Sequence, residues 1–485
     1  MSEDDELRSA NKTSQQFLAS LSDELFEEHL RALKQRIKGD SSSGTPDGIR
    51  LARHAESVVR ALKAKRKNAL RNLAVTAGFN YKKAEPKTSR LLDSFFPDRK
   101  KSGWKTGNRK SARLTIDRFC LIDHPAETLR ALAQIAKAES RNFDIQINFE
   151  MRECTDVAAF LVFGLMRRDM HPVFRGGMIT KAVRKVLQAV QLDNFLKIRL
   201  NPSQDTTDLW PFEVRTKSTK QEIANPQLSP QQKEKVAVDF VQNVQNWLKA
   251  ATELDGEFEQ LNDDAVSELY GLITEILDNA ERHGSTDDEY VGGWSIAGFM
   301  ARRPIENSNE SDYVCHVAIV SEGTTIADGL ENPVHDDSRK AIDAYLGVQR
   351  LMAKNHGPPE LLRTIMALQP GVTRLQTQGA RGGTGFPRTI QWLQDLGGGF
   401  TDREPQMTVI SGNCCVMLRP PYNKMARAPG GKAENEYIFF NRSNEFGAAP
   451  DPNFAFTLEQ SFPGAIIAMR FRLRPRRART RHENH

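Results

Sequence analysis

The stretch TEILDNAERHG, residues 274–284, combines a helical pattern with polar residues that a buried helix would not carry. Glu275, Asn279 and His283 are four residues apart, so a helix places them in one narrow row. An apolar stripe adjoins or overlaps this row and consists of Leu269, Leu272, Ile273, Ile276, Leu277 and Ala280. Half-buried carboxylate and amide groups cost stability unless a partner satisfies them. We therefore expect the row at the edge of a buried helix face, beside a polar partner.

A magnesium ion carrying a nucleoside triphosphate would satisfy this polar row. The amide oxygen of Asn279 is a hard neutral ligand, and Mg²⁺ binds few protein groups while keeping waters and phosphates. The carboxylate of Glu275, one turn earlier, is placed to orient or deprotonate an attacking water. A structural helix whose polar groups hydrogen-bond to neighbouring loops explains the row equally well. The stretch by itself leaves both explanations open.

Two later segments bear on this choice. SEGTTIADGL, residues 321–330, follows an apolar strand-like run, and QGARGGTGFPRTIQWLQDLGGGF, residues 378–400, places several glycines before a helix. Glycine lets the backbone approach a phosphate closely, and the N-terminus of a helix attracts anions. Strand-like runs at 406–411, 414–420 and 462–473 complete the region.

This ordered set resembles the GHKL ATPases, which include DNA gyrase, heat-shock chaperones, mismatch-repair proteins and histidine kinases. The resemblance covers about 240 residues and implies an α/β (α+β) fold, a two-layer sandwich of helices on a mixed sheet with an ATP pocket. EILDNAERH matches the N-box of the family, which makes Glu275 the water-activating base, Asn279 the Mg²⁺ ligand and His283 a neighbour of the phosphates. GARGGTGF matches the glycine-rich box that wraps the phosphates through Gly379, Gly382, Gly383, Thr384 and Gly385.

One part of the family pattern is altered. The adenine-recognising loop of these ATPases reads Asp-x-Gly-x-Gly-Ile, whereas the aligned run here is SEGTTI, residues 321–326. Gly323 is kept, but Ser321 replaces the Asp that accepts the adenine amino group, and Thr325 replaces the second Gly. Glu322 or Asp328 would have to take over as acceptor, although a one-residue offset on a strand points Glu322 the other way. A missing acceptor costs about 1–3 kcal/mol, which weakens nucleotide binding without abolishing it.

Residues 327–378 correspond to the lid of such a pocket. AKNHGPP, residues 353–359, and LQPGVTRLQTQG, residues 368–379, have the composition of loops, which suits a segment that orders when triphosphate binds. Three arginines in or just after this segment could contact phosphates, although exposure to solvent is the default expectation for such residues. They are Arg363, Arg374 and Arg381.

Strand-like and helical patterns alternate over residues 113–200, which indicates a small α/β domain. This block resembles the STAS domain of anti-sigma-factor antagonists, because Asp156 opens an apolar helix after a strand and VRKVLQAVQLDNFLKI, residues 183–198, ends the block. Phosphorylated members carry a Ser at the helix start, where this chain has Val157 and Ala158, so no phosphorylation switch is carried over. Thr155 is a candidate stand-in for that Ser, although a helix-capping role is the more ordinary explanation.

The remaining segments complete the predicted organisation. Helical patterns at 5–38 and 48–76 form an N-terminal region, and a Pro-, Gln-, Ser- and Thr-rich stretch separates the two larger domains. The predicted division is 1–80 helical region, 81–112 mobile basic connector, 113–200 STAS-like domain, 201–231 linker, 232–474 GHKL-type ATP-binding domain and 475–485 basic tail.

Composition excludes several protein classes. No apolar run approaches the roughly 20 residues of a membrane span, and the acidic N-terminus has no signal-peptide pattern, so we expect a cytoplasmic protein without membrane partners. The 5 cysteines include no CxxC pair, which favours buried thiols over a zinc site or disulfides. The net charge of +6 over 485 residues says little about partners, although the basic connector and tail are candidate nucleic-acid contacts.

The leading functional hypothesis is a nucleotide-driven conformational switch that binds ATP and Mg²⁺ and hydrolyses ATP slowly. It would regulate a protein partner or act as a homodimer. A histidine kinase is disfavoured because the phosphoacceptor pattern His-Glu-x-x-x-x-Pro is absent, and His54 reads as a helix-surface residue. The alternatives are an anti-sigma-like protein kinase with a fused STAS-like domain, a non-hydrolysing scaffold with a degenerate pocket, and an ATP-gated nucleic-acid-binding protein.

Overall fold

A computed structural model shows a mixed α/β protein built around one large sheet. The residues that it describes are 23–38, 46–76, 87–100, 110–174, 176–201, 208–217, 232–253, 263–283, 293–304, 311–331, 333, 335–352, 355–372, 385–396, 405–427 and 436–473. The basic tail at 475–485 lies outside these residues.

The central sheet has five strands in the order β3-β4-β5-β9-β6. Their bounds are Leu209–Lys217 for β3, Trp294–Pro304 for β4, Ser311–Glu322 for β5, Ala455–Leu473 for β9 and Gln406–Leu418 for β6. Each of the four neighbouring pairs is antiparallel. The expectation of a mixed sheet is therefore wrong for these strands. A two-stranded ribbon, β7 (Ala426–Arg427) with β8 (Glu436–Tyr437), interrupts the path from β6 to β9.

Residues 110–196 form the α/β block that the alternating pattern predicted. The strands β1 (Lys110–Ile116) and β2 (Asn142–Phe149) are parallel, and α5 (Pro125–Arg141) connects them. Three helices follow, α6 (Ala158–Asp169), α7 (Lys181–Ala189) and α8 (Leu192–Phe195). The strand–helix–strand order requires a parallel pair, because a crossover helix returns the chain to the same end of the sheet.

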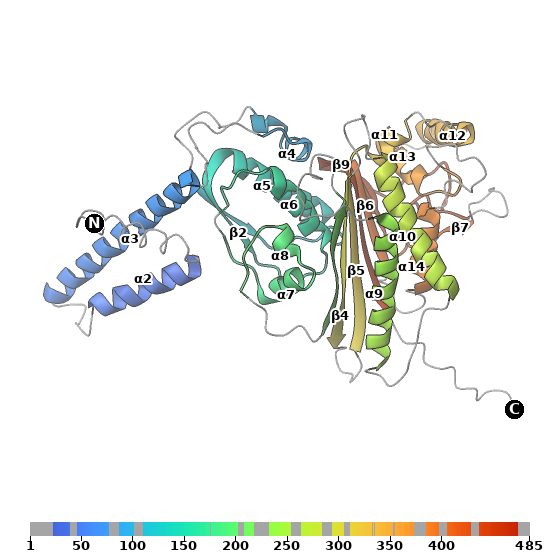
Figure 1. Ribbon diagram of the computed structural model, residues 1–485. Helices are drawn as coiled ribbons and strands as arrows, with labels where there is room; N and C mark the ends of the chain where they lie inside the picture. Colours follow the sequence, from blue (N-terminus) through green and yellow to red (C-terminus); the bar gives the residue numbers. More distant parts are fainter. Residues whose placement is uncertain are drawn as a thin grey trace.

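The large sheet is buried on both faces, so the molecule has three layers (Figure 1). The α/β block covers one face, and a helical layer covers the other. The alternation along β5 shows this directly, since Val317 and Ile319 join the core under the helices, whereas Ala318 and Val320 join the core of the α/β block. The block and the sheet thus share one hydrophobic core. The helical layer includes α9 (Lys233–Glu253), α10 (Asp263–His283), α13 (Pro359–Ala367) and α14 (Gly385–Leu396).

Part of the predicted linker at 201–231 is a strand. Residues 209–217 form β3, the edge of the large sheet, and Phe212 is buried under the helices. The Val214 N–H also donates to the Val190 carbonyl of the α/β block at 3.0 Å. Pro211 is compatible with this place because an edge strand has one unpaired side. The sequence indicated a linker here because polar residues flank this short strand on both sides.

Part of the predicted basic connector at 81–112 is also folded. A short helix, α4 (Arg90–Phe95), and a 3₁₀ turn, η1 (Pro97–Lys100), bury Leu91, Leu92 and Phe95 in the core of the α/β block. The fully buried Arg99 donates from Nε to Glu139 Oε2 at 3.1 Å and from Nη1 to the Lys87 carbonyl at 2.7 Å. The expectation of a mobile connector is wrong for residues 87–100, because it counted Arg99 as a solvated charge.

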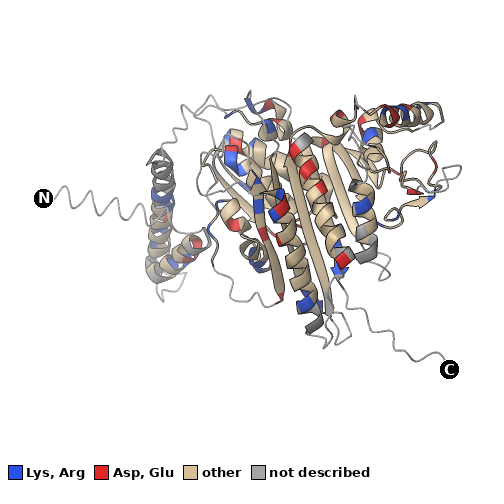
Figure 2. Cartoon of the chain, turned by 45° about the vertical axis from the view of Figure 1, so that its right-hand side comes forward, with Lys and Arg blue, Asp and Glu red and all other residues tan. Residues whose placement is uncertain are grey.

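An N-terminal hairpin of two helices projects from the body (Figures 1 and 2). Its helices are α2 (Asp23–Lys38) and α3 (Pro46–Thr76), and they pack against each other. The Arg66 guanidinium lies over the Phe26 ring at 4.3 Å, and Lys63 pairs with Glu27 at 2.8 Å. His54 is exposed on α3, as predicted. The part of the predicted first helix at 5–22 lies outside the described residues.

The cysteines and the helices bear on the compositional expectations. All five thiols are free and buried, as predicted. Burial raises the pKa of Cys154 to about 12, so this thiol stays protonated.

In the described part of the chain, no helix combines the length and apolar character needed to cross a bilayer.

We expect the buried pair of Arg99 and Glu139 to be essential for the α/β block. Arg99→Leu leaves the Glu139 carboxylate buried without its cation, and breaking a buried pair on one side costs about 3–5 kcal/mol. Urea unfolding of the variant should show this loss. Lys100→Gln is the control, because Lys100 is 54% exposed beside Asp93 and such pairs contribute about 1 kcal/mol or less. An equal effect of both variants would contradict the role of burial.

A second prediction concerns the ion pair between β9 and the segment before α5. Arg470 donates to both carboxylate oxygens of Asp123, at 2.8 and 3.0 Å. Burial opposes ionisation of Asp123, but the hydrogen bonds and charge of Arg470 outweigh it, so the pKa of Asp123 is lowered. A lowered pKa adds stability above the unfolded-state value, and this stability is lost as pH falls through the folded-state pKa.

Asp123→Asn should therefore lower the free energy of unfolding by about 1 kcal/mol at neutral pH. The difference from the wild type should shrink once the pH falls below about 4. Urea titrations at several pH values measure it. Glu459→Gln is the control, because its pairing with Arg130 at 3.8 Å joins the same two layers in solvent. A difference for Asp123→Asn that is independent of pH would rule out the ionised pair as its cause.

Candidate functional site

The helix α10 places its two flanks against different neighbours. Asp278 and Glu281 lie on the flank that faces α9, since both pair with Lys233 of that helix. The helical repeat puts Glu275 and Asn279 on the other flank. Because α10 also packs against α14, this second flank lies toward α14.

The predicted row has the expected position relative to the core. Leu272, Ile276 and Ala280 are buried beside it, and Glu275 and Asn279 are half-buried. None of the described hydrogen bonds or ion pairs involves the Asn279 side chain. His283 ends α10, and its side chain lies outside the described residues. A half-buried amide without a recorded protein partner is able to bind a ligand at this flank.

The glycine-rich segment leads directly into α14. Its residues Gly379, Gly382, Gly383 and Thr384 lie outside the described part of the chain, so their predicted phosphate contacts stay predictions. Gly385 is the first residue of α14, and Ile390 and Leu393 bury this helix in the same core as α10. The N-terminus of α14 carries N–H groups without helical partners, which attract anions.

The SEGTTI segment makes a bend at the end of β5. Gly323 has a φ of +146°, which favours glycine, and its N–H donates to the Pro463 carbonyl at 3.0 Å. Thr325 caps the short helix α11 (Ile326–Gly329), since its Oγ1 accepts from the Asp328 N–H at 3.1 Å. The Ile326 N–H donates to Ser411 Oγ at 2.8 Å. Thr325, at the position of the second family glycine, thus has a structural role as a helix cap.

Glu322 is not available as an adenine acceptor on the α10 side. It shares the face of β5 that Ala318 and Val320 turn toward the α/β block, and it pairs with the guanidinium of Arg168 on α6. Side chains alternate along β5, as the one-residue offset predicted, and this alternation turns Glu322 toward the α/β block. Asp328 is exposed on α11 and stays a predicted acceptor. Ser321, at the family's Asp position, donates from Oγ to the Ala465 carbonyl at 3.4 Å.

The predicted lid is mostly helical. Residues 327–372 include most of α11, all of α12 (Asp336–Met352) and all of α13. Buried side chains of α12 and α13 fill the core under α10, among them Ile342, Tyr345, Leu361 and Ile365. The two stretches with loop composition lie outside these helices, at 355–358 and 368–372 in the described residues, and the lid role of the segment stays a prediction. Arg363 lies 3.6 Å from Glu331, whereas Arg374 and Arg381 lie outside the described residues.

The start of α6 differs from its prediction in one detail. Asp156, rather than Thr155, supplies the side-chain acceptor, since its Oδ1 accepts from the Ala158 N–H at 2.7 Å. Its Oδ2 accepts from the Leu121 N–H at 2.7 Å, and burial raises the pKa of Asp156 to about 6. This carboxylate therefore holds the helix start and the preceding loop together.

A polar cluster on the α9 flank of α10 was missed by sequence reasoning. Trp294 Nε1 donates to Glu281 at 3.0 Å, and Lys217 of β3 lies 2.8 Å from the same carboxylate. Burial opposes its ionisation, but the hydrogen bonds from Lys217 and Trp294 and the nearby lysine charges lower the pKa of Glu281. The cluster joins the edge strand to α10. Only the positions of three separate elements bring these residues together, so no local pattern indicates them.

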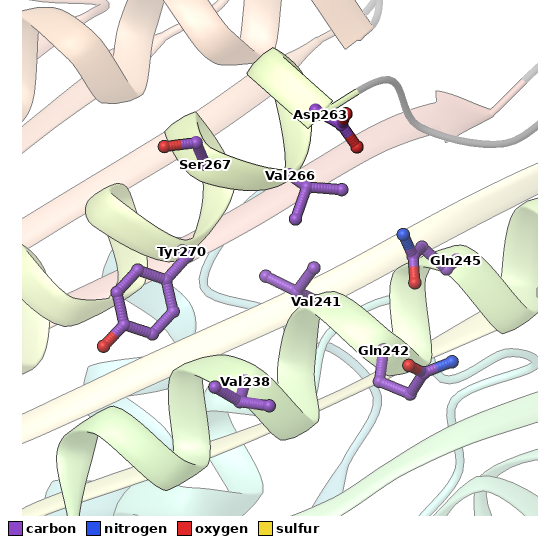
Figure 3. Close-up of a pocket in the computed structure, with 8 residues that line it drawn as sticks. All are labelled: Val238, Val241, Gln242, Gln245, Asp263, Val266, Ser267 and Tyr270. Carbon is purple, nitrogen blue, oxygen red and sulfur yellow. The ribbon is translucent and has the colours of Figure 1, made fainter.

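A groove between α9 and α10 was also not predicted (Figure 3). It encloses about 390 Å³ and is lined by Val238, Val241, Gln242, Gln245, Asp263, Val266, Ser267 and Tyr270. Val241 and Val266 point toward each other across it (Figure 3). The groove lies on the flank opposite Asn279, and its lining contains no Lys or Arg. Its chemistry does not suit a triphosphate.

The comparisons with known proteins identify no relative. No protein-family model matches the chain, and no curated protein or solved structure matches it. Within the described ranges, no group of three or more His, Cys, Asp and Glu side chains is placed to hold a metal ion. A magnesium site made of one amide, waters and phosphates needs no such group.

We expect the bend at the end of β5 to depend on a glycine of β9. A Cβ added to Gly464 would lie 2.0 Å from the Ser321 carbonyl oxygen, and its φ is +147°. Gly464→Ala should lower the free energy of unfolding by about 1–3 kcal/mol, because both the contact and the backbone are strained. Thermal unfolding measures the loss. Gly347→Ala on α12 is the control, since an added Cβ meets nothing within 4 Å and should stabilise by about 0.5–1 kcal/mol; a neutral Gly464→Ala would contradict the tight approach.

Proposed function

We propose that the chain binds ATP with Mg²⁺ between α10 and the start of α14 and acts as a nucleotide-driven conformational switch with slow ATP hydrolysis. The observation that supports this proposal is the packing of α10, whose flank carries Asn279, against α14, which begins directly after the glycine run.

The residues present fit a metal–triphosphate ligand. Among the described residues the Asn279 side chain has no hydrogen-bond partner, so its amide oxygen could coordinate a hard cation, and the N-terminus of α14 could offer N–H groups to phosphate oxygens. Glu275 lies one turn before Asn279 on the same flank, where a carboxylate can orient a water. Bound Mg²⁺ would supply charge neutralisation for the phosphates. The altered adenine loop is compatible with weaker nucleotide binding.

A route from this site to the rest of the molecule runs through β5. Its last residue, Glu322, pairs with Arg168 of α6, directly before the bend at Gly323. A ligand that shifts the bend would therefore act on the α/β block. Any such ligand must bind the two conformations with different affinity, and phosphates held by backbone N–H groups provide that difference. The proposed output is a protein partner or a second copy of the chain.

The alternatives differ in how well the α/β block supports them. A kinase paired with a phosphorylated STAS-like domain needs an accessible acceptor hydroxyl at the start of α6. Val157 and Ala158 are fully buried there and carry no hydroxyl, and the nearest hydroxyl, that of Thr155, is half-buried. The scaffold alternative predicts no nucleotide binding. The switch is therefore preferred over the kinase, and binding measurements separate it from the scaffold.

The test is a titration of labelled ATP against the full chain, with and without Mg²⁺. Wild type should bind more tightly with Mg²⁺, and Asn279→Ala should lose this difference, a loss of about 1–3 kcal/mol for a buried polar contact. Glu322→Gln is the matched control, because it faces the α/β block and should keep the Mg²⁺ dependence. Equal affinity of wild type and Asn279→Ala in both conditions would overturn the site.

A second arm of this experiment addresses hydrolysis. Glu275→Ala should keep Mg²⁺-dependent ATP binding and lose phosphate release, because it removes the water-orienting carboxylate while leaving the metal ligand. Phosphate release is measured at saturating ATP. Unchanged phosphate release in Glu275→Ala would assign the catalytic role to another residue.

A further inference from the structure

Much of the positive charge of the chain lies between residues 46 and 113. Residues 46–113 contain 19 Lys and Arg against 5 Asp and Glu, a formal charge of +14, whereas the whole chain carries +6. The remaining residues therefore carry −8. Such a separation of charge within one chain is typical of proteins that bind a polyanion. The long helix α3 begins this basic part.

One face of α3 carries exposed arginines. Arg50, Arg53 and Arg60 are all exposed, and helical geometry places them within about 80° of one another around the axis. None of the described ion pairs involves any of the three. Lys65 extends the exposed basic surface toward the C-terminal end of the helix. Figure 2 shows the hairpin at the edge of the molecule, and the three arginines are exposed in the described part of the chain.

The opposite face of α3 is already covered. Ala55 is fully buried, and Arg66 lies over Phe26 of α2, which is 3% exposed. A helix that lies in a membrane surface buries its apolar face among the lipids. In α3 that face packs on α2, and the outward face carries Arg50, Arg53 and Arg60 together with the exposed Ile49 and Glu56. This arrangement favours a ligand that is recognised by charge and phosphate geometry over a lipid bilayer.

We propose that α3 binds the phosphate backbone of duplex nucleic acid through Arg50, Arg53 and Arg60. Arginine suits this role because its planar guanidinium donates two parallel hydrogen bonds to phosphate oxygens. From Arg50 to Lys65 the helix rises about 22 Å, which matches about six base pairs of duplex. The contacts reach only the backbone, so binding is independent of base sequence. This binding requires no nucleotide at α10, and it is separate from the proposed switch.

The test measures binding of the full chain, without ATP, to a fluorescent 20-base-pair DNA duplex of arbitrary sequence. Fluorescence anisotropy over a series of salt concentrations yields the slope of log affinity against log salt. The triple variant Arg50→Gln/Arg53→Gln/Arg60→Gln should reduce the magnitude of this slope by about 2.7, because each phosphate contact contributes about 0.9. Its affinity at the lowest salt should fall more than about tenfold. The same measurement with a duplex RNA of equal length shows whether α3 binds DNA, RNA or both.

Two further variants control for net charge and for folding. Lys235→Gln/Lys340→Gln/Arg350→Gln removes the same charge from exposed positions on α9 and α12 and should leave the slope unchanged. Arg50→Lys/Arg53→Lys/Arg60→Lys keeps the charge of α3 and should restore most of the slope. Circular dichroism confirms that each protein is folded.

Three outcomes would overturn the proposal. If the wild type binds neither duplex, nucleic acid is excluded as the ligand of α3. If the α3 and control triple variants lose equal affinity, the effect comes from net charge alone. The third outcome is binding to phosphatidylserine vesicles that the α3 triple variant loses while its duplex binding stays unchanged. That result would assign α3 to an anionic membrane surface.

Discussion

Burial of both faces of the five-stranded antiparallel sheet is the constraint on which the rest of the structure depends. Side chains alternate along β5 between the helical layer and the α/β block, so neither neighbour can leave without exposing a row of apolar residues. Polar contacts then fix the register between the layers. Arg470 with Asp123 and Arg168 with Glu322 cross from the sheet to the α/β block at different places. The molecule is therefore one three-layered body with a projecting N-terminal hairpin.

This architecture separates the candidate site from the α/β block by the width of the sheet. The helices α10 and α14 of the proposed site lie in the helical layer, and β5 of the sheet is tied through its last residue, Glu322, to Arg168 of α6 on the other side. In the proposed switch, a change at the bend of β5 would act on this existing contact. The buried Asp156 holds the start of that same helix through two backbone N–H groups. The proposed switch would act across the sheet, which lies between the helical layer and the α/β block.

Charge is used in two different ways in this chain. Inside the body, cations are paired, as with the fully buried Arg99 and Glu139, because an unpaired buried charge is costly. On α3, by contrast, Arg50, Arg53 and Arg60 lie in solvent. A count of basic residues treats both kinds alike, and the N-terminal basic region contains examples of each. Burial is what separates a structural cation from a candidate contact.

The sequence by itself determined the alternating α/β block, the helix 263–283 with its half-buried polar flank, and the buried thiols, because local periodicity reports which face of an element is apolar. It also indicated that Glu322 and Ser321 point to opposite faces of the strand, because successive side chains alternate along a strand. Only the tertiary structure decided that 209–217 completes the sheet, that Leu91, Leu92 and Phe95 join the core, that α12 and α13 are packed helices, and that Lys217, Glu281 and Trp294 meet. Those features depend on contacts between residues far apart in the chain, which no local pattern encodes.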